Sequence, residues 1–303
     1  MPGLEQWIGA EARYAAASMA RAISATGLVM ERSAFGQRVI PRPGSVLASP
    51  VTAHYDPDPD YFFHWFRDSA IVIDALRVAL GAGYAEPVAI ARFREFVQFS
   101  LALRSIDGQA FLRQADLRAA VRPDFLRYLR SDEELRALSA ETVSADTRVN
   151  ADGTLDFLRW SRPQTDGPAL RSIALLRWSR QFPELHADST LDAALTELLS
   201  ADLAFTLAFI HRPSGDVWEE RDGYHYYTQL LQAEALQRGA EWRASAQPRE
   251  RTEAWGSAAE ETLARLDGFW DHAAGYYRAR AATERAEPER ELDVSVVLGV
   301  LLA

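Results

Sequence analysis

Amphipathic helical periodicity is the feature that most constrains the fold of this chain. In about eight segments the apolar residues recur at intervals of three and four, whereas no segment alternates convincingly as a strand does. The sequence therefore predicts an all-α protein. Its predicted helices span residues 4–24, 68–83, 86–103, 168–182, 190–210, 225–242, 249–266 and 293–303.

The connections between these helices are alternately short and long. Residues 104–166 lack a clear period, and long irregular regions of this kind are usually functional or mobile. This alternation fits a ring of helical hairpins, whose long loops gather at one end, better than a simple bundle. Periodicity alone does not choose between these two architectures. We expect one domain over residues 1–303 in either case.

Composition excludes several classes of function. The net charge is −10 without a Lys/Arg block, so we expect no nucleic-acid partner. The chain has no cysteine, and its six histidines show no paired metal-ligand spacing, so we expect neither a metal nor a cofactor. No apolar run reaches the length of a membrane helix, and the first residues lack the features of a secretory signal. We therefore expect a cytoplasmic protein.

The first segment that could carry chemistry is PDYFFHWFRDSA, residues 59–70. It is a run of aromatic rings that ends in Arg67 and Asp68, and an adjacent cation and carboxylate offer donors and acceptors to the vicinal hydroxyls of a sugar. Trp65 offers a ring for stacking. The alternative is a buried loop in which Asp68 or Ser69 caps the following helix.

The second segment is WSRPQTDGPALR, residues 160–171. Asp166 followed by Pro168 resembles a helix start, with a capping side chain and a proline in the first turn, and that role requires no substrate. Trp160 has no place in such a cap, which makes it a candidate for ligand contact.

The third segment, DVWEE, is the most informative. Asp216, Glu219 and Glu220 lie within five residues around Trp218. Mutual repulsion and partial desolvation are expected to raise the pKa of at least one of these carboxyl groups. A raised pKa is what a general acid for glycoside cleavage requires, since its proton must persist near neutral pH. A solvated acidic loop is the alternative.

These three segments, in this order, resemble signature regions of the glucoamylases, glycoside hydrolase family 15. The resemblance runs from Pro59 to Leu236, and the opening helix with GSVLASP, residues 44–50, is also similar. It implies an (α/α)6 toroid and an inverting hydrolysis of α-1,4-glucans from their non-reducing ends. An α-glucan or malto-oligosaccharide would then be the substrate.

The resemblance also implies roles for individual residues. Glu219 matches the general acid, and Arg67 with Asp68 matches the pair that holds the terminal glucose. Trp160 matches the tryptophan beside the acid. Residues that line the same sugar-binding subsite are matched by Asp216, Trp218 and Glu220. Trp65 is a further candidate for stacking on a sugar, and Arg290 lies near the place where the family has an arginine.

One part of the family pattern has no match. An inverting hydrolase needs a second carboxylate, roughly 6.5 to 9.5 Å from the acid, to activate water. Nothing after Asp293 resembles the segment that supplies it, and about eight helices are predicted where the toroid has twelve. The sequence thus predicts a toroid that lacks its C-terminal part and exposes apolar helix faces. We expect the isolated chain to be poorly stable and weakly active.

Two alternatives to a glucoamylase stay open. The chain could be a noncatalytic carbohydrate-binding protein that retains the sugar-binding half of the site. It could also be a related hydrolase that acts on trehalose, isomaltose or dextran. The unmatched second carboxylate favours the first alternative, and the presence of Glu219 favours an enzyme.

Overall fold

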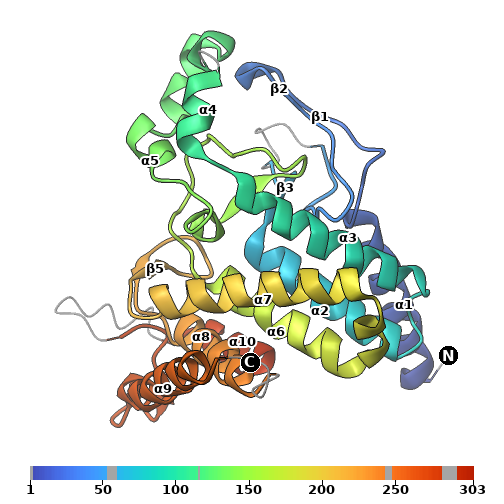
Figure 1. Ribbon diagram of the computed structural model, residues 1–303, viewed down its shortest axis with the longest axis vertical. Coiled ribbons are helices and arrows are strands. Elements are labelled where there is room, and N and C mark those ends of the chain that lie inside the picture. The colour runs from blue at the N-terminus through green and yellow to red at the C-terminus, as the bar shows by residue number, and fades with distance from the viewer. Residues whose placement is uncertain (1–2, 53–59, 115–116, 243–247, 282–291) are drawn as a thin grey trace. The chain divides into compact units, whose positions relative to one another are not determined.

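The structure is a computed structural model that describes residues 3–52, 60–114, 117–242, 248–281 and 292–303 (Figure 1). Its chain separates into two compact units. The first comprises Met1–Trp160 and Trp178–Leu198, and the second comprises Ser161–Arg177 and Leu199–Ala303. We describe each unit by itself.

Helices account for most of the described secondary structure. They are α1 Leu4–Ala22, α2 Phe66–Gly81, α3 Val88–Ala102, α4 Gly108–Gln114, α5 Asp132–Arg136, α6 Asp166–Gln181, α7 Ser189–Phe209, α8 Tyr226–Glu241, α9 Arg249–Leu266 and α10 Ser295–Leu302. All eight predicted helices are present, and α9 has the predicted bounds. The two short helices α4 and α5 lie in the region that the sequence left irregular.

No segment of the sequence alternates convincingly as a strand does, but the described chain contains short strands. Four two-stranded antiparallel ladders occur: β1 Met30–Arg32 with β2 Gln37–Val39, β3 Phe63–Trp65 with β4 Arg148–Asn150, β5 Ser214–Gly215 with β6 Asp222–Gly223, and β7 Trp270–Asp271 with β8 Tyr276–Tyr277. Each strand has two or three residues, which is too short for the alternation that reveals a strand in a sequence.

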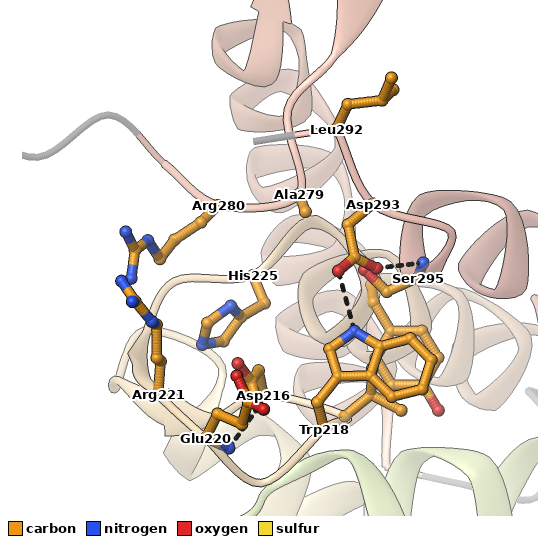
Figure 2. Close-up of a pocket in the computed structure, with 12 residues that line it drawn as sticks. Asp216, Trp218, Glu220, Arg221, His225, Ala279, Arg280, Leu292, Asp293 and Ser295 are labelled. Carbon is orange, nitrogen blue, oxygen red and sulfur yellow. Dashed lines mark hydrogen bonds between the residues drawn. The ribbon is translucent and has the colours of Figure 1, made fainter. Parts of the chain in front are cut away.

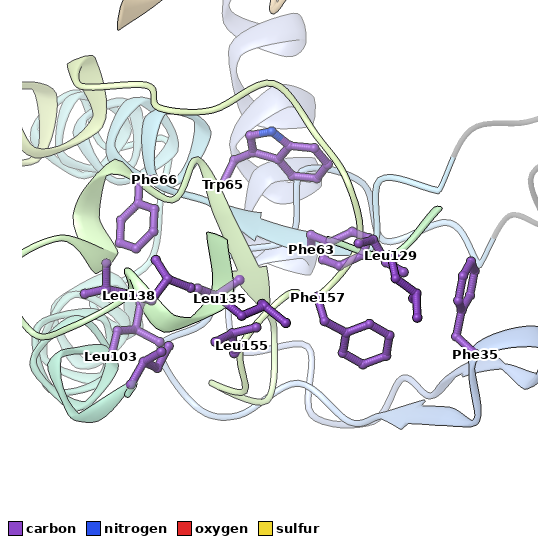
Figure 3. Packing of buried hydrophobic residues seen from close by; sticks show 14 of the residues in the cluster. Phe35, Phe63, Trp65, Phe66, Leu103, Leu129, Leu135, Leu138, Leu155 and Phe157 are labelled. Atoms are coloured by element: carbon purple, nitrogen blue, oxygen red, sulfur yellow. The ribbon is translucent and has the colours of Figure 1, made fainter. Parts of the chain in front are cut away.

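The first unit packs around an aromatic and aliphatic core. α2 packs against both α1 and α3. One part of this core lies beside the β3–β4 ladder, where side chains from residues 35–158 meet (Figure 3). Phe63 and Val149 contribute to it from the two strands and are at most 1% exposed. This core holds β3, and therefore the start of α2, in a fixed place.

In the second unit, α8 packs against both α9 and α10 (Figure 1). Tyr226, Leu266 and Phe269 form the buried part of that contact. Gly239 allows the close approach of α8 to α7, because a Cβ atom at this position would lie 2.6 Å from a Leu203 methyl carbon. α10 exposes Val297, Val300 and Leu301 by 54–70%. Among the described residues, no helix is both long and apolar enough to cross a bilayer.

Candidate active site

The DVWEE segment forms a tight loop in the second unit. β5 and β6 pair in antiparallel register immediately before and after it, with Gly215 opposite Asp222. The Asp216 amide donates to the Arg221 carbonyl over 2.8 Å, and the Glu219 amide donates to the Asp216 carbonyl over 3.0 Å. These bonds close the chain on itself, so that consecutive side chains leave the loop in different directions.

Glu219 occupies an unusual backbone position in this loop. Its φ is +64°, a left-handed conformation that costs a residue with a side chain about 1 to 2 kcal/mol. Non-glycine residues in this region persist only where the surrounding structure holds them, and such positions are common in functional sites. The loop thus accepts a strained backbone at the residue that the sequence identifies as the candidate acid.

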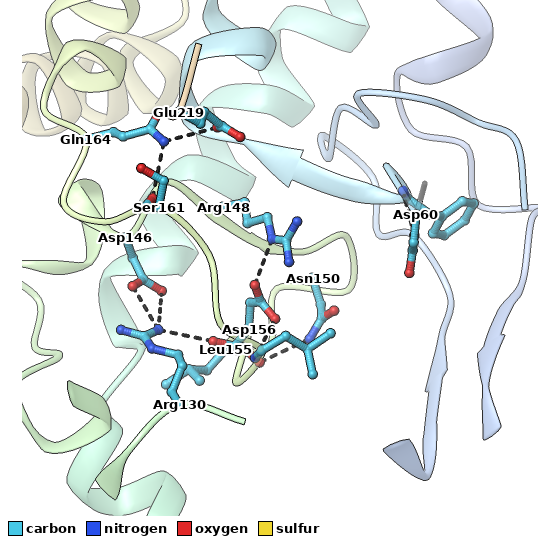
Figure 4. Close-up of polar contacts among 12 residues, drawn as sticks. Asp60, Arg130, Asp146, Arg148, Asn150, Leu155, Asp156, Ser161, Gln164 and Glu219 are labelled. Atoms are coloured by element: carbon cyan, nitrogen blue, oxygen red, sulfur yellow. Dashed lines mark hydrogen bonds and ion pairs between the residues drawn. The ribbon is translucent and has the colours of Figure 1, made fainter. Parts of the chain in front are cut away.

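The WSRPQTDG segment fixes this carboxyl group. Gln164 Nε2 donates to Glu219 Oε1 over 3.0 Å (Figure 4) and to the Ser161 carbonyl over 3.2 Å. The Gly215 amide donates to the Pro163 carbonyl over 2.8 Å, and a Cβ at Gly215 would lie 3.1 Å from Ser161 Oγ. A side chain at position 215 would therefore press against the WSRPQTDG segment, and Gln164 anchors the Glu219 side chain.

A cavity of about 330 Å³ lies on one side of the loop (Figure 2). Three sequence-predicted site residues line it together: Asp216, Trp218 and Glu220. Glu219 is not among its lining residues. The Trp218 side chain is 47% exposed, and its Nε1 donates to Asp293 Oδ2 over 2.9 Å.

The same cavity carries residues that the sequence did not single out. Arg221, His225 and Arg280 lie beside Asp216 along its wall (Figure 2). Burial lowers the pKa of His225, an effect that the nearby Asp216 charge opposes. The cavity thus combines cationic donors, carboxylate acceptors and an exposed indole. That mixture suits a neutral polyhydroxylated ligand.

The PDYFFHWFRDSA residues lie in the first unit, and the structure describes them from Asp60 onward. Trp65 is the residue immediately before α2, Arg67 is 8% exposed, and Asp68 lies in the first turn. The alternative in which Asp68 or Ser69 caps the helix does not hold, because the N-cap residue is Trp65 and no side chain caps the helix. The helix begins at Phe66, three residues earlier than a cap at Asp68 would place it, and it follows directly on β3, in which Trp65 pairs with Arg148.

Trp65 and Trp160 contact each other in the same unit. Their ring centroids are 5.8 Å apart and the ring planes are inclined by 79°, an edge-to-face pair. Trp65 is buried, whereas Trp160 is partly exposed. Trp160 therefore offers ring surface from a buried aromatic support, and Arg148, which lies against both rings, was not identified from the sequence.

Asp166 and Arg171, both in the WSRPQTDGPALR segment, lie in α6. Pro168 lies in the first turn of α6, as predicted, whereas Asp166 is the first residue of the helix and not the cap that precedes it. Arg171 Nε and Nη2 bind the two carboxylate oxygens of Asp202 over 2.7 and 2.6 Å, with both side chains 2% exposed. Arg290 lies outside the described residues.

Comparisons with known proteins identify the family of this chain. The family model described as glycosyl hydrolases family 15 matches residues 33–303. The intracellular sporulation-specific glucoamylase of Saccharomyces cerevisiae is 32% identical over 206 residues, which cover 64% of this chain and 31% of that protein. A probable glucoamylase of Schizosaccharomyces pombe is 27% identical over 241 residues, 77% of this chain and 45% of that protein.

A solved structure gives the same result for the fold. The family 15 glucoamylase from Hypocrea jecorina superposes with a TM-score of 0.73 at 24% identity, and the match covers 98% of this chain and 42% of that one. The predicted fold class, all-α and of the (α/α)6 glucoamylase type, is confirmed. The chain spans less than half the length of these relatives. Together, the ordered motifs and the match over residues 33–303 show that this chain belongs to glycoside hydrolase family 15.

Proposed function

We propose that this protein hydrolyses α-1,4-glucans from their non-reducing ends by an inverting mechanism, with Glu219 as the general acid. The observation that carries the proposal is the Glu219 loop. A carboxylic acid sits at a strained backbone position, and a side-chain amide from a second family motif holds it. Family membership supplies the reaction type, and this loop supplies a residue able to perform its proton transfer.

The proposed chemistry begins with the proton of Glu219. Its carboxyl group donates that proton to the glycosidic oxygen as the bond to the terminal sugar breaks, so that the departing sugar leaves as a neutral alcohol. Gln164 Nε2 donates to Oε1 and so holds the carboxyl group in place for this transfer. Inversion requires that water attack the opposite face of the sugar with help from a second carboxylate.

The sugar-binding roles follow the motif matches. We propose that Arg67 and Asp68 hydrogen-bond the hydroxyls of the terminal glucose and that Trp160 stacks against a sugar ring. In the second unit, we propose that the cavity lined by Asp216, Trp218 and Glu220 binds a sugar, because it offers an exposed indole beside carboxylate acceptors.

Glucose release from maltotriose, measured together with maltotriose binding, tests the proposal. The unaltered chain should bind the sugar and release glucose above a protein-free blank, and the first product should be the β-anomer. Binding without any glucose release would support a noncatalytic carbohydrate-binding protein instead. Release of the α-anomer would refute inversion. Equal activity on trehalose, isomaltose or dextran would refute the α-1,4 preference.

A further inference from the structure

Arg148 occupies a buried aromatic cage in the first unit. Its side chain is 0% exposed. Its guanidinium carbon lies 4.1 Å from the centre of the Phe63 ring, 4.8 Å from the Trp65 ring and 3.9 Å from the Trp160 ring. These are short distances for a cation and a ring, and contacts of this kind strengthen when water is excluded.

A single ion pair fixes the guanidinium in this cage. Arg148 Nε donates to Asp156 Oδ2 over 2.8 Å, and Asp156 is equally buried (Figure 4). The other oxygen, Asp156 Oδ1, accepts the Leu158 amide over 3.0 Å. The Asp156 carboxylate is thus held by the backbone that leads to Trp160, and it sets the angle of the Arg148 side chain.

The two terminal nitrogens of Arg148 are unusual. Nη1 and Nη2 are buried and have no hydrogen-bond partner among the described residues. Leaving such donors unpaired ordinarily costs about 1 to 3 kcal/mol each, so sequences avoid it unless the group serves another purpose. Here the faces of aromatic rings take the place of acceptors, and Trp160 is the partly exposed member of that cage.

We propose that Arg148 is a positioning residue that fixes the Trp160 indole as a preformed surface for a sugar ring. The part of this inference that concerns sugar binding by Trp160 rests on the proposed function. The part that concerns the orientation of the Trp160 ring does not. A ring already held in its bound orientation loses little conformational entropy when the sugar binds, and the sugar therefore binds more tightly. The buried cation also polarises the indole from the side away from solvent.

A neighbouring ion pair provides a matched control. Arg130 binds Asp146 over 2.9 Å and is 5% exposed, so it is a buried Arg–Asp pair of the same kind (Figure 4). Arg130 Nη1 also donates to the Asp156 carbonyl over 3.1 Å. The double variants Arg148→Met/Asp156→Asn and Arg130→Met/Asp146→Asn each remove both charges of one buried pair. Only the first should affect Trp160.

The experiment uses the full chain labelled with 5-fluorotryptophan. Its eight tryptophans give eight ¹⁹F resonances, and the one that disappears in Trp160→Phe is assigned to Trp160. We expect Arg148→Met/Asp156→Asn to shift and broaden this resonance while leaving that of Trp178 in place. Maltotriose should bind this variant about tenfold more weakly, the factor expected for one buried cation–ring contact. The Arg130 variant should change neither quantity.

Each outcome decides one of the two proposals. An unchanged Trp160 resonance in the Arg148 variant, or an equal change in the Arg130 variant, overturns the positioning role. If the Trp160 resonance changes as expected but maltotriose moves no resonance of the unaltered chain, the positioning role stands and the proposed function fails. Should the double variant not fold, Arg148→Lys replaces it, because a lysine keeps the charge but loses the planar contact. It must shift the same resonance for the role to stand.

Discussion

The Arg171–Asp202 pair offers the sharpest test of how the second unit is held together. Asp202→Ala removes a bidentate partner that lies 2.6 and 2.7 Å from a guanidinium with 2% exposure. Removal of one member of a buried pair leaves an uncompensated charge and costs about 3 to 5 kcal/mol. We therefore expect Asp202→Ala to lower the free energy of unfolding by roughly that amount.

Two controls separate the buried charge from other effects. Arg171→Met/Asp202→Leu removes both charges and should recover most of the lost stability, since apolar residues of similar volume often replace a buried pair without loss. Glu253→Ala breaks the exposed Arg249–Glu253 pair, whose side chains are 88% and 59% exposed, and should have no measurable effect. Urea unfolding followed by circular dichroism measures all three. A loss below about 1 kcal/mol for Asp202→Ala would refute the reasoning.

Three further perturbations have defined outcomes. Gly44→Ala should destabilise the protein by more than about 3 kcal/mol, because its Cβ would lie 2.0 Å from the Glu95 carbonyl oxygen. Gly83 also has a positive φ but has open space around it, so Gly83→Ala should cost about 1 kcal/mol. A similar loss of stability for both variants in thermal unfolding would contradict the role of the clash. Burial lowers the pKa of His225 in the folded protein below its value in the unfolded chain, so the stability of the protein should fall as the pH drops below about 6.5. His225→Gln should flatten this dependence between pH 7.5 and 5.5. An identical slope of stability against pH in both proteins would refute the role of His225. Val300 and Leu301 of α10 are 61% and 70% exposed, and exposed apolar faces promote association, so the unaltered chain should self-associate in sedimentation experiments. Replacing both residues with lysine should reduce that association, and unchanged association would show that this face is not involved.

The helices were predictable because their signal is local. A period of three and four residues over a long window located α9 within its observed bounds. The start of α2 was harder to predict, since its position depends on the pairing of Trp65 with Arg148, 83 residues further along the chain. Short ladders such as β5–β6 are made by contacts of the same kind, and they leave no period in the sequence.

The motifs of the candidate site could be found in the sequence, but the residues that contact and orient the motif side chains could not. Resemblance identified Glu219 and Trp160 as candidates, and their roles stay predictions. The partner of Glu219 is 55 residues away in sequence, and nothing local distinguishes Gln164 from an exposed glutamine. Arg148 was missed because a single arginine in a loop is normally expected at the surface. Only the fold reveals that aromatic rings enclose it.

Glu219 is the residue on which the account depends, and leaving-group dependence tests its role most directly. The measurement compares hydrolysis of maltose with hydrolysis of α-glucosyl fluoride, whose fluoride departs without needing a proton, for the unaltered chain, Glu219→Gln and the control Glu220→Gln. We predict that Glu219→Gln loses at least about 100-fold in kcat on maltose but far less on the fluoride, and that Glu220→Gln shows no such difference between the substrates. Equal losses on both substrates, or unchanged turnover of maltose by Glu219→Gln, would contradict the assignment of Glu219 as the general acid.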